Sequence, residues 1–171
     1  MPHWLAHQDE RLCLSINRAA AVGWLRDFSR AVSRLGDGAF WYALVAWLVA
    51  WQGSAALRPV AHMVLTGLIC TALYKRLKAR TSRPRPYRVN AAIRRGGQPL
   101  DEFSFPSRHS LHAVAFALVS LAYFPSLAPI VVPLTVLVAL SRLVLGLHYP
   151  SDVLAGVLIG ALVAGGSLPL A

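Results

Sequence analysis

Long apolar stretches alternate with short polar segments along most of this chain. Residues 38–57 contain no Lys, Arg, Asp or Glu, and the run 109–141 is also free of formal charge. Because an α-helix rises 1.5 Å per residue, about 20 such residues reach across the hydrocarbon core of a bilayer. Three prolines in the middle of the second run predict two helices joined by a turn around 124–128.

The pattern predicts five membrane-spanning helices. They lie at roughly 38–57, 59–77, 107–123, 127–147 and 151–168. In residues 10–34, arginines interrupt apolar positions that recur at roughly helical spacing, which indicates an amphipathic helix or helix pair at the membrane interface. A sixth span tucked against the others is the alternative.

The predicted architecture is all-α, an integral membrane bundle of five to six spans with an N-terminal amphipathic segment. We expect a single domain over 1–171, with 1–35 at the interface and 36–171 in the bundle. Composition agrees, because 56% of the residues are hydrophobic and only 14% are charged. The net charge of +10 comes mainly from 75–108 and 11–34, which leaves no soluble domain to bind nucleic acid.

Three polar groups interrupt the apolar pattern at the edges of the predicted spans. With five spans, the turns at 52–58 and 124–128 lie on one side of the membrane. The basic segment 75–106 and the end of the fourth span lie on the other side. All three groups therefore reach the same face. Ionisable groups at such positions are costly, and by default they mark a functional site.

The third group is Ser141-Arg142 followed by His148 and Asp152. Pro150 suits the first turn of a helix, which places His148 just before that helix and Asp152 within its first turn. A carboxylate there can accept the Nδ1 proton of a histidine and leave Nε2 free to attack. Helix capping by His148 and Asp152 is an equally good interpretation of this group alone.

The other two groups suit an anion. Ser107 is a good N-cap, and the first N–H groups of a helix bind anions. His109 lies in that first turn, where it can give a proton to a leaving oxygen. Lys78 begins a basic segment in which flanking prolines hold Arg85 extended as a fork for phosphate. Binding of anionic lipid headgroups by a basic cluster is the alternative.

Together these residues resemble the phosphatidic acid phosphatase type 2 superfamily, which shares its core with vanadium-dependent haloperoxidases. The family motifs are Lys-x6-Arg-Pro, Pro-Ser-Gly-His and Ser-Arg-x5-His-x3-Asp. Here they correspond to Lys78 to Pro86, Pro106 to His109, and Ser141 to Asp152. The departure is Arg108, where the family has glycine.

The resemblance implies a role for each residue in phosphoryl transfer. His148 would be the nucleophile and form a phosphohistidine, Asp152 would orient it, and His109 would protonate the leaving group. The phosphoryl oxygens would be held by Lys78, Arg85, Arg142 and Ser107. The family works without a metal or another cofactor, because fixed cations stabilise the charge.

Three further residues have their own interpretations. We expect Arg108 to contact the substrate headgroup, for example a second phosphate; a side chain facing solvent or lipid headgroups is the alternative. We expect His112 to line the pocket or support the site, although His109, His112, His148 and Asp152 can also be read as a metal set. We interpret His62 as a helix–helix hydrogen-bonding residue.

We therefore expect a metal-independent phosphatase that acts on a lipid phosphate, such as a polyprenyl diphosphate, phosphatidic acid or phosphatidylglycerol phosphate. A phosphotransferase, a haloperoxidase and a non-catalytic headgroup-binding protein are the alternatives. The expected location is the bacterial inner membrane, and the sequence predicts no oligomeric state. The resemblance implies a site facing the extracytoplasmic side, whereas the positive-inside rule indicates the opposite; we take the former.

Overall fold

The computed structural model describes residues 3–99 and 101–168, and every regular element in these ranges is helical. This confirms the all-α prediction. In chain order the elements are α1 (His3–Asn17), η1 (Arg18–Ala21), α2 (Gly23–Arg34), η2 (Leu35–Ala39), α3 (Phe40–Gln52), η3 (Gly53–Ala56), α4 (Leu57–Thr81), α5 (Pro86–Val89), α6 (Arg108–Tyr123), η4 (Pro125–Leu127), α7 (Ala128–Val144) and α8 (Pro150–Ser167).

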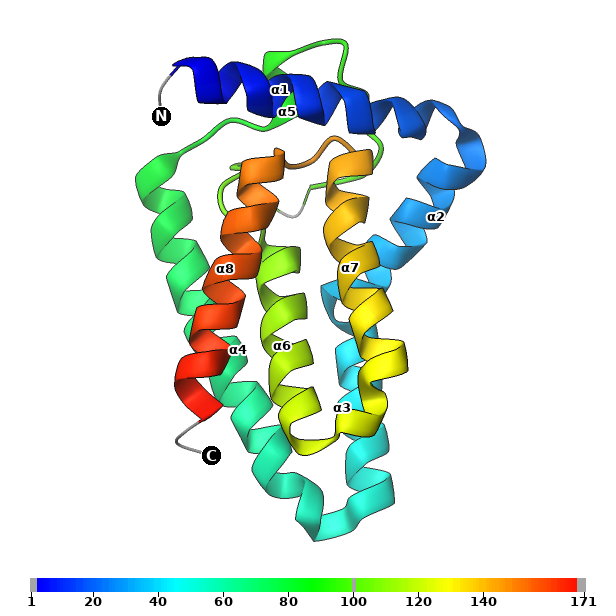
Figure 1. Ribbon diagram of the computed structural model, residues 1–171, viewed down its shortest axis with the longest axis vertical. Helices are drawn as coiled ribbons and strands as arrows, with labels where there is room; N and C mark the ends of the chain where they lie inside the picture. Colours follow the sequence, from blue (N-terminus) through cyan, green and yellow to red (C-terminus); the bar gives the residue numbers. More distant parts are fainter. Residues whose placement is uncertain (1–2, 100, 169–171) are drawn as a thin grey trace.

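α4, α6, α7 and α8 run lengthwise through the molecule beside the continuous path of α2, η2 and α3, and α1 lies across one end (Figure 1). The turns η3 and η4 lie at the opposite end, as does the end of α8. The segments 82–99 and 101–107 and the turn 145–149 lie at the end covered by α1, called here the α1 end. All three polar groups therefore share one end, as counting spans predicts.

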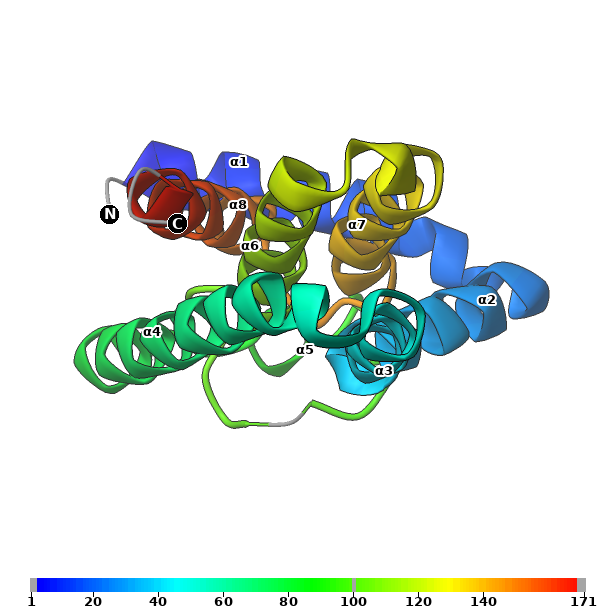
Figure 2. The ribbon, with the colours of Figure 1, turned by 90° about the horizontal axis from the view of Figure 1, so that it is seen from below.

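The helices form two layers around α6. Seen along the bundle, α3 and α4 lie in one layer, and α8 and α7 lie in the other with α6 between them (Figure 2). α6 contacts α4, α7 and α8. The closest approach is to α8, because Gly156 has no side chain: a Cβ there would lie 2.6 Å from the carbonyl oxygen of Ser107. Small residues let membrane helices approach in this way.

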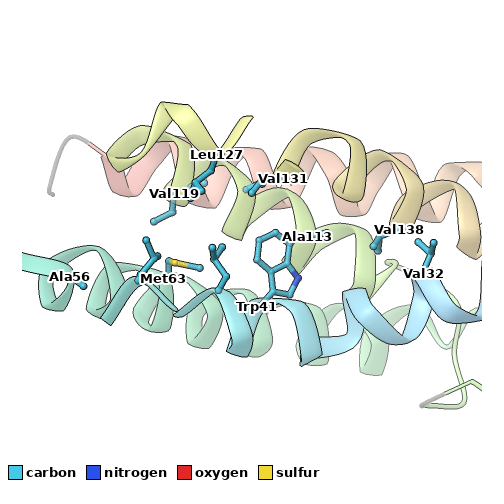
Figure 3. Packing of buried hydrophobic residues seen from close by; sticks show 13 residues of the cluster. Val32, Trp41, Ala56, Met63, Ala113, Val119, Leu127, Val131 and Val138 are labelled. Carbon is cyan, nitrogen blue, oxygen red and sulfur yellow. The ribbon is translucent and has the colours of Figure 1, made fainter. Parts of the chain in front are cut away.

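Apolar side chains fill the space between the layers (Figure 3). Trp41 of α3 points toward α6, and its ring centroid lies 5.3 Å from that of Phe116. Val32 and Val138 meet where α2 packs on α7. Large apolar side chains also remain exposed on the outside, for example Leu162 at 73%. Apolar surface on both faces of a helix is typical of a bundle surrounded by lipid.

The N-terminal segment is a helix pair, as one interpretation predicts, but its two helices are placed differently. α1 lies across the bundle, whereas α2 packs along α7 and continues through η2 into α3. The break between α1 and α2 falls at 18–22. Gly36, whose missing side chain lets η2 approach α7, positions the other end of α2; a Cβ there would collide with Val138.

Three stretches of the described chain are long and apolar enough to cross a membrane. They are Gly23–Val89, which includes α2, α3 and α4, then Pro125–Val144 and Pro150–Ser167. α6 has 16 residues and lies at the centre of the bundle. α4 continues four residues past its predicted end at 77, to Thr81, so Lys78 lies on a helix and not in a loop.

His62 connects three helices near the end opposite α1. Its Nδ1 lies 3.1 Å from the hydroxyl of Tyr123 in α6, and its Nε2 lies 2.8 Å from the hydroxyl of Ser167 in α8. The prediction of a helix–helix hydrogen-bonding residue is confirmed.

Candidate active site

The predicted site residues gather at the α1 end from several elements of the chain. They are Lys78 near the end of α4, Arg85 before α5, Ser107, Arg108 and His109 at the start of α6, Arg142 in the last turn of α7, His148 in the following turn, and Asp152 in the first turn of α8. All of them are buried except Arg108, which is partly exposed. Burial of so many charged groups requires close partners.

His148 is held by a backbone carbonyl. Its Nδ1 lies 2.7 Å from the carbonyl oxygen of Ser104, so Nδ1 carries the proton and donates it. Nε2 then has a free lone pair, which faces Nη1 of Arg85 at 3.3 Å. Burial lowers the pKa of His148 well below its ordinary value, and the charges of Arg142 and Arg85 act in the same direction. His148 is therefore a neutral imidazole with Nε2 as its nucleophilic atom.

Asp152 has different partners from those predicted. Its Oδ2 lies 3.8 Å from Nδ1 of His148, which is too long for a hydrogen bond, and instead accepts the backbone N–H of Tyr149 at 2.8 Å. Pro150 begins α8, so Asp152 is the third residue of the helix, and its carboxylate reaches back to the N-cap. These contacts are the ones that the capping interpretation predicts. The hydrogen bond from Nδ1 of His148, predicted for Asp152, goes instead to the carbonyl oxygen of Ser104.

Arg83, which sequence reasoning missed, supplies the counter-charge to Asp152. Its Nη1 lies 2.7 Å from Oδ1 of Asp152, and its Nη2 lies 2.7 Å from Oδ2 of Asp9 in α1. The guanidinium also lies 4.0 Å from the ring centroid of Tyr149. Asp9 in turn accepts the backbone N–H of Ser151 at 2.9 Å. These contacts attach α1 to the first turn of α8, directly behind His148.

Asp101 joins two of the predicted phosphate-binding cations. Its Oδ1 accepts hydrogen bonds from Nζ of Lys78 at 2.5 Å and from Nη2 of Arg85 at 2.6 Å. Burial alone would raise the pKa of Asp101, but Lys78 and Arg85 outweigh it and hold the pKa below its ordinary value. A carboxylate therefore engages the donors that the sequence assigns to phosphate.

Ser107 caps α6 as predicted. Its hydroxyl faces the N–H and the hydroxyl of Ser110, and its own N–H donates to the Asp152 carbonyl at 2.9 Å. The second contact places the start of α6 beside the start of α8. The first turns of α6 and α8 therefore lie side by side, with His148 just before α8.

Arg142 is almost fully buried and only partly paired. Its Nη1 donates to the hydroxyl of Ser33 in α2, a residue that sequence reasoning also missed. Its Nε is one of three buried side-chain atoms in 3–99 and 101–168 that have no hydrogen-bond partner. A buried donor without a partner is costly, and an anion bound beside it would satisfy it.

Arg108 and His109 both meet Asp37, a residue in η2 that the sequence interpretation did not include. Arg108 Nη2 forms an ion pair with Oδ1 of Asp37, and Nε2 of His109 lies 3.5 Å from the same oxygen. His112 has other partners, with Nε2 3.1 Å from the hydroxyl of Thr71 and Nδ1 3.0 Å from the Arg108 carbonyl. It supports the α4–α6 contact and, as predicted, lines a cavity beside His109.

Two cavities meet at this point. One has a volume of about 720 Å³ and is lined by polar and basic residues from α2, the 95–98 segment, α6 and α7, among them Arg30, Arg34, Arg95 and Arg142. The other has a volume of about 420 Å³ and lies between α3, α4 and α6, where apolar side chains line most of it. Asp37 and His109 line both. The polar cavity and the apolar cavity therefore meet at Asp37 and His109.

A model of the PAP2 superfamily matches residues 55–170, which carry all three polar groups. The chain belongs to the PAP2 superfamily. The resemblance inferred from its motifs is confirmed, and the chain is a membrane phosphatase of the PAP2 lipid phosphatase kind.

Two mycobacterial proteins resemble this PAP2 chain in sequence. Decaprenylphosphoryl-5-phosphoribose phosphatase of Mycobacterium tuberculosis is 36% identical over 142 residues, which cover 83% of this chain and 68% of the relative. The protein of the same name from Mycolicibacterium smegmatis is 37% identical over 131 residues, covering 75% and 69%.

Two solved PAP2 structures share the fold. The crystal structure of Aquifex aeolicus LpxE superposes with a TM-score of 0.80 at 27% identity and covers 93% of each chain. A transmembrane PAP2 type phosphatidylglycerolphosphate phosphatase from Bacillus subtilis superposes with a TM-score of 0.78 at 24% identity, covering 99% of this chain and 87% of that one. The arrangement of helices is therefore that of an integral membrane PAP2 protein.

Proposed function

We propose that this PAP2 protein hydrolyses a phosphomonoester or diphosphate of a lipid through a phosphohistidine, without a metal ion or other cofactor. The observation that carries the proposal is the setting of His148. Its Nδ1 is fixed by the Ser104 carbonyl and its Nε2 faces the guanidinium of Arg85. A neutral, oriented imidazole beside a buried cation is what nucleophilic attack on a phosphoryl group requires.

In the first step, Nε2 of His148 attacks phosphorus and the bond from phosphorus to the leaving oxygen breaks. His109 gives its proton to that oxygen, so the leaving group departs as an alcohol or a lipid phosphate. His148 then carries the phosphoryl group. General acid catalysis of this kind contributes about 10²–10⁴-fold to the rate, most for leaving groups that are poor without a proton.

In the second step, water attacks the phosphohistidine, and His109 takes a proton from that water. The bond from Nε2 to phosphorus breaks, and inorganic phosphate and neutral His148 are regenerated. Asp152 acts on this step only indirectly, by capping α8 and neutralising Arg83 behind His148.

The phosphoryl oxygens would be held by cations that already surround the space. Lys78 and Arg85 are oriented by Asp101, and Nε of Arg142 offers a buried, unpaired donor. Ser107 and the N–H groups at the start of α6 add neutral donors. Such preorganised charge stabilises the transition state without further rearrangement.

The two cavities support an amphiphilic substrate. The apolar cavity between α3, α4 and α6 suits a hydrocarbon chain, and the polar cavity suits a headgroup. The mycobacterial relatives are named for a decaprenyl lipid that carries a phosphorylated ribose. We therefore place polyprenyl-linked phosphates first among the substrates, ahead of phosphatidic acid and phosphatidylglycerol phosphate. Arg108 lines the apolar cavity and pairs with Asp37, which lines both cavities, so it would contact a second phosphate at their junction.

The proposal includes five membrane crossings, by α3, α4, α6, α7 and α8, within one domain. The site would face the extracytoplasmic side. Single cysteines at Arg94 and Ser54 test this, since both residues are exposed and lie at opposite ends of the bundle. Cys13 and Cys70 are buried and contribute little background. A membrane-impermeant thiol reagent applied to intact cells should label position 94 and spare position 54; the reverse pattern would place the site in the cytoplasm.

Phosphate release by purified protein tests the chemistry. The panel contains a polyprenyl diphosphate, a polyprenylphosphoryl phosphoribose, phosphatidic acid and phosphatidylglycerol phosphate, each in detergent micelles with a chelator present. We expect release from at least one lipid by the wild type and none above background by His148→Ala. His7→Ala, at an exposed histidine of α1, is the matched control. Absence of release from every lipid would overturn the proposal.

A further inference from the structure

Asp37 occupies the point where the polar and apolar cavities meet. It lines both cavities, forms an ion pair with Arg108 and lies 3.5 Å from Nε2 of His109. Among the described carboxylates, it is the one at ion-pair distance from His109. It belongs to none of the three family motifs, since it precedes them by about 40 residues in the chain.

The local sequence Gly36-Asp37-Gly38 places this carboxylate by two separate constraints. Gly36 permits η2 to press against α7, where a Cβ would collide with Val138. Gly38 has φ +136°, in a region that disfavours side chains, and it breaks the helix so that α3 starts in a new direction. Wide turns within helices of this kind are frequent at functional sites. The backbone of η2 therefore directs the side chain of Asp37 toward the start of α6.

The charges around His109 show why a carboxylate matters there. His109 is buried, and Arg142 of α7, His148 of the following turn, and Arg108 and His112 of its own helix are close enough to oppose a positive charge on it. A general acid must hold a proton before it can give one away, and positive neighbours oppose the charged form of an imidazole. Asp152 and Asp101 are committed to other cations. Asp37 is left as the anionic partner for His109.

We propose that Asp37 is a positioning residue for the acid step: its charge stabilises the protonated form of His109 and holds Nε2–H at the junction of the two cavities. The inference rests on the proposed function of His109 as the acid. Without substrate, Arg108 shares the carboxylate. When a lipid phosphate binds, Arg108 turns to the headgroup, and Nε2–H turns from the carboxylate to the leaving oxygen while the charge of Asp37 stays beside the ring.

Asp37 also neutralises Arg108, and a double-mutant comparison separates the two roles. Arg108→Gly restores the residue that the family motif has at this position, so the fold should tolerate it. If Asp37 acts only as a counter-ion to Arg108, Asp37→Asn does not lower kcat in the Arg108→Gly background. If Asp37 acts on His109, Asp37→Asn lowers kcat in that background as well.

The experiment measures phosphate release from the lipid of the panel that the wild type cleaves fastest, over a range of pH, for four proteins. They are the wild type, Asp37→Asn, Arg108→Gly and the double variant. We expect Asp37→Asn to lower kcat at least about tenfold in both backgrounds, as a partial loss of acid catalysis. We also expect the alkaline limb of its pH–kcat profile to move about one unit lower, because a nearby carboxylate favours the imidazolium. A purely structural role would leave the position of that limb unchanged.

Asp27→Asn is the matched control, since Asp27 is an exposed aspartate of α2, and it should retain wild-type kcat and pH dependence. Two results would overturn the role of Asp37 while leaving the proposed phosphatase activity intact. One is a kcat of the double variant equal to that of Arg108→Gly. The other is an alkaline limb of Asp37→Asn that does not move. Loss of activity in every protein, wild type included, would instead overturn the proposed function.

Discussion

Asp101 and Arg85 form a hydrogen-bonded ion pair, with 2.6 Å between Oδ1 and Nη2, in the place assigned to a phosphoryl group. The same oxygen accepts a hydrogen bond from Lys78, so one carboxylate engages two phosphate-binding cations. An incoming phosphate must share these donors with Asp101 or displace it. The carboxylate of Asp101 therefore holds Lys78 and Arg85 in the orientation in which they would bind a phosphate.

Replacement of Asp101 by asparagine should therefore weaken the fold and strengthen anion binding. The substitution leaves Lys78 and Arg85 buried without a counter-charge, and we expect the free energy of unfolding to fall by about 2 kcal/mol. This is less than the roughly 3–5 kcal/mol typical of a fully buried ion pair, because the Asp101 side chain is 30% exposed. Inorganic phosphate should inhibit Asp101→Asn up to about tenfold more strongly, a gain of about 1.4 kcal/mol.

Thermal melts measure the loss of stability, and phosphate inhibition of lipid hydrolysis measures the gain in anion binding. Glu102→Gln is the control, because Glu102 pairs with Arg88 on the surface and should change neither quantity. Weaker inhibition of Asp101→Asn by phosphate would mean that Asp101 helps to shape the anion site and does not compete for it.

The neutral state of His148 predicts how stability depends on pH. An unfolded histidine titrates near pH 6.5, whereas burial keeps the folded pKa of His148 well below this value. Below about pH 6.5 the unfolded chain therefore binds one more proton than the folded protein, and the free energy of unfolding falls as pH drops. The contribution is up to about 1.4 kcal/mol per pH unit until the folded pKa is reached.

Chemical denaturation of wild type and His148→Gln between pH 7 and 5 measures this slope. We expect the variant to lose stability less steeply with acid, since its side chain does not titrate. Parallel slopes for the two proteins would show that the pKa of His148 is the same in the folded and unfolded states, so that burial does not keep it neutral in acid.

Asp9 should be essential for the attachment of α1. Asp9→Asn leaves Arg83 with Asp152 alone and weakens the contact to Ser151, so we expect a loss of about 2–3 kcal/mol from a buried network. Hydrogen exchange should rise in α1 and in the first turn of α8, and remain at the wild-type level in α3. Exchange that rises equally in all helices would indicate general unfolding instead.

Gly156→Ala tests how closely α6 must approach α8. The added Cβ would lie 2.6 Å from the Ser107 carbonyl, so the helices must separate. We expect a loss of about 1–3 kcal/mol in stability and a fall in kcat, because Ser107 and the start of α6 move away from His148. Gly165→Ala, on the same helix with open space around it, is the control and should raise or preserve the melting temperature.

The sequence predicted the helices and the clustering of the site well, because both follow from local patterns. Apolar runs and prolines located α4, α7 and the turn at η4, and fixed spacings placed His109 and His148 at helix ends. Ser104 was not predictable as the partner of His148, since any backbone carbonyl has the same sequence signature. Its position depends on how the 90–107 segment returns over the bundle.

Three functional neighbours were missed for a related reason. Asp37, Arg83 and Asp101 each look like ordinary loop or helix-end charges in the sequence. In the chain, Asp37 is 71 residues from Arg108, Arg83 is 69 residues from Asp152, and Asp101 is 16 residues from Arg85. Signals were present, since Asp37 lies between two glycines and Asp101 shortly precedes a motif, but neither identifies which cation each carboxylate meets.

The hydrogen bond from Ser151 to Asp9 joins residues 142 positions apart. During synthesis, α1 therefore leaves the ribosome long before the helix to which it attaches has been made. Contacts between chain ends form late because all intervening segments must first be in place. The docking of α1 therefore follows the synthesis of α8, and the α1 end of the bundle closes only after both segments have been made.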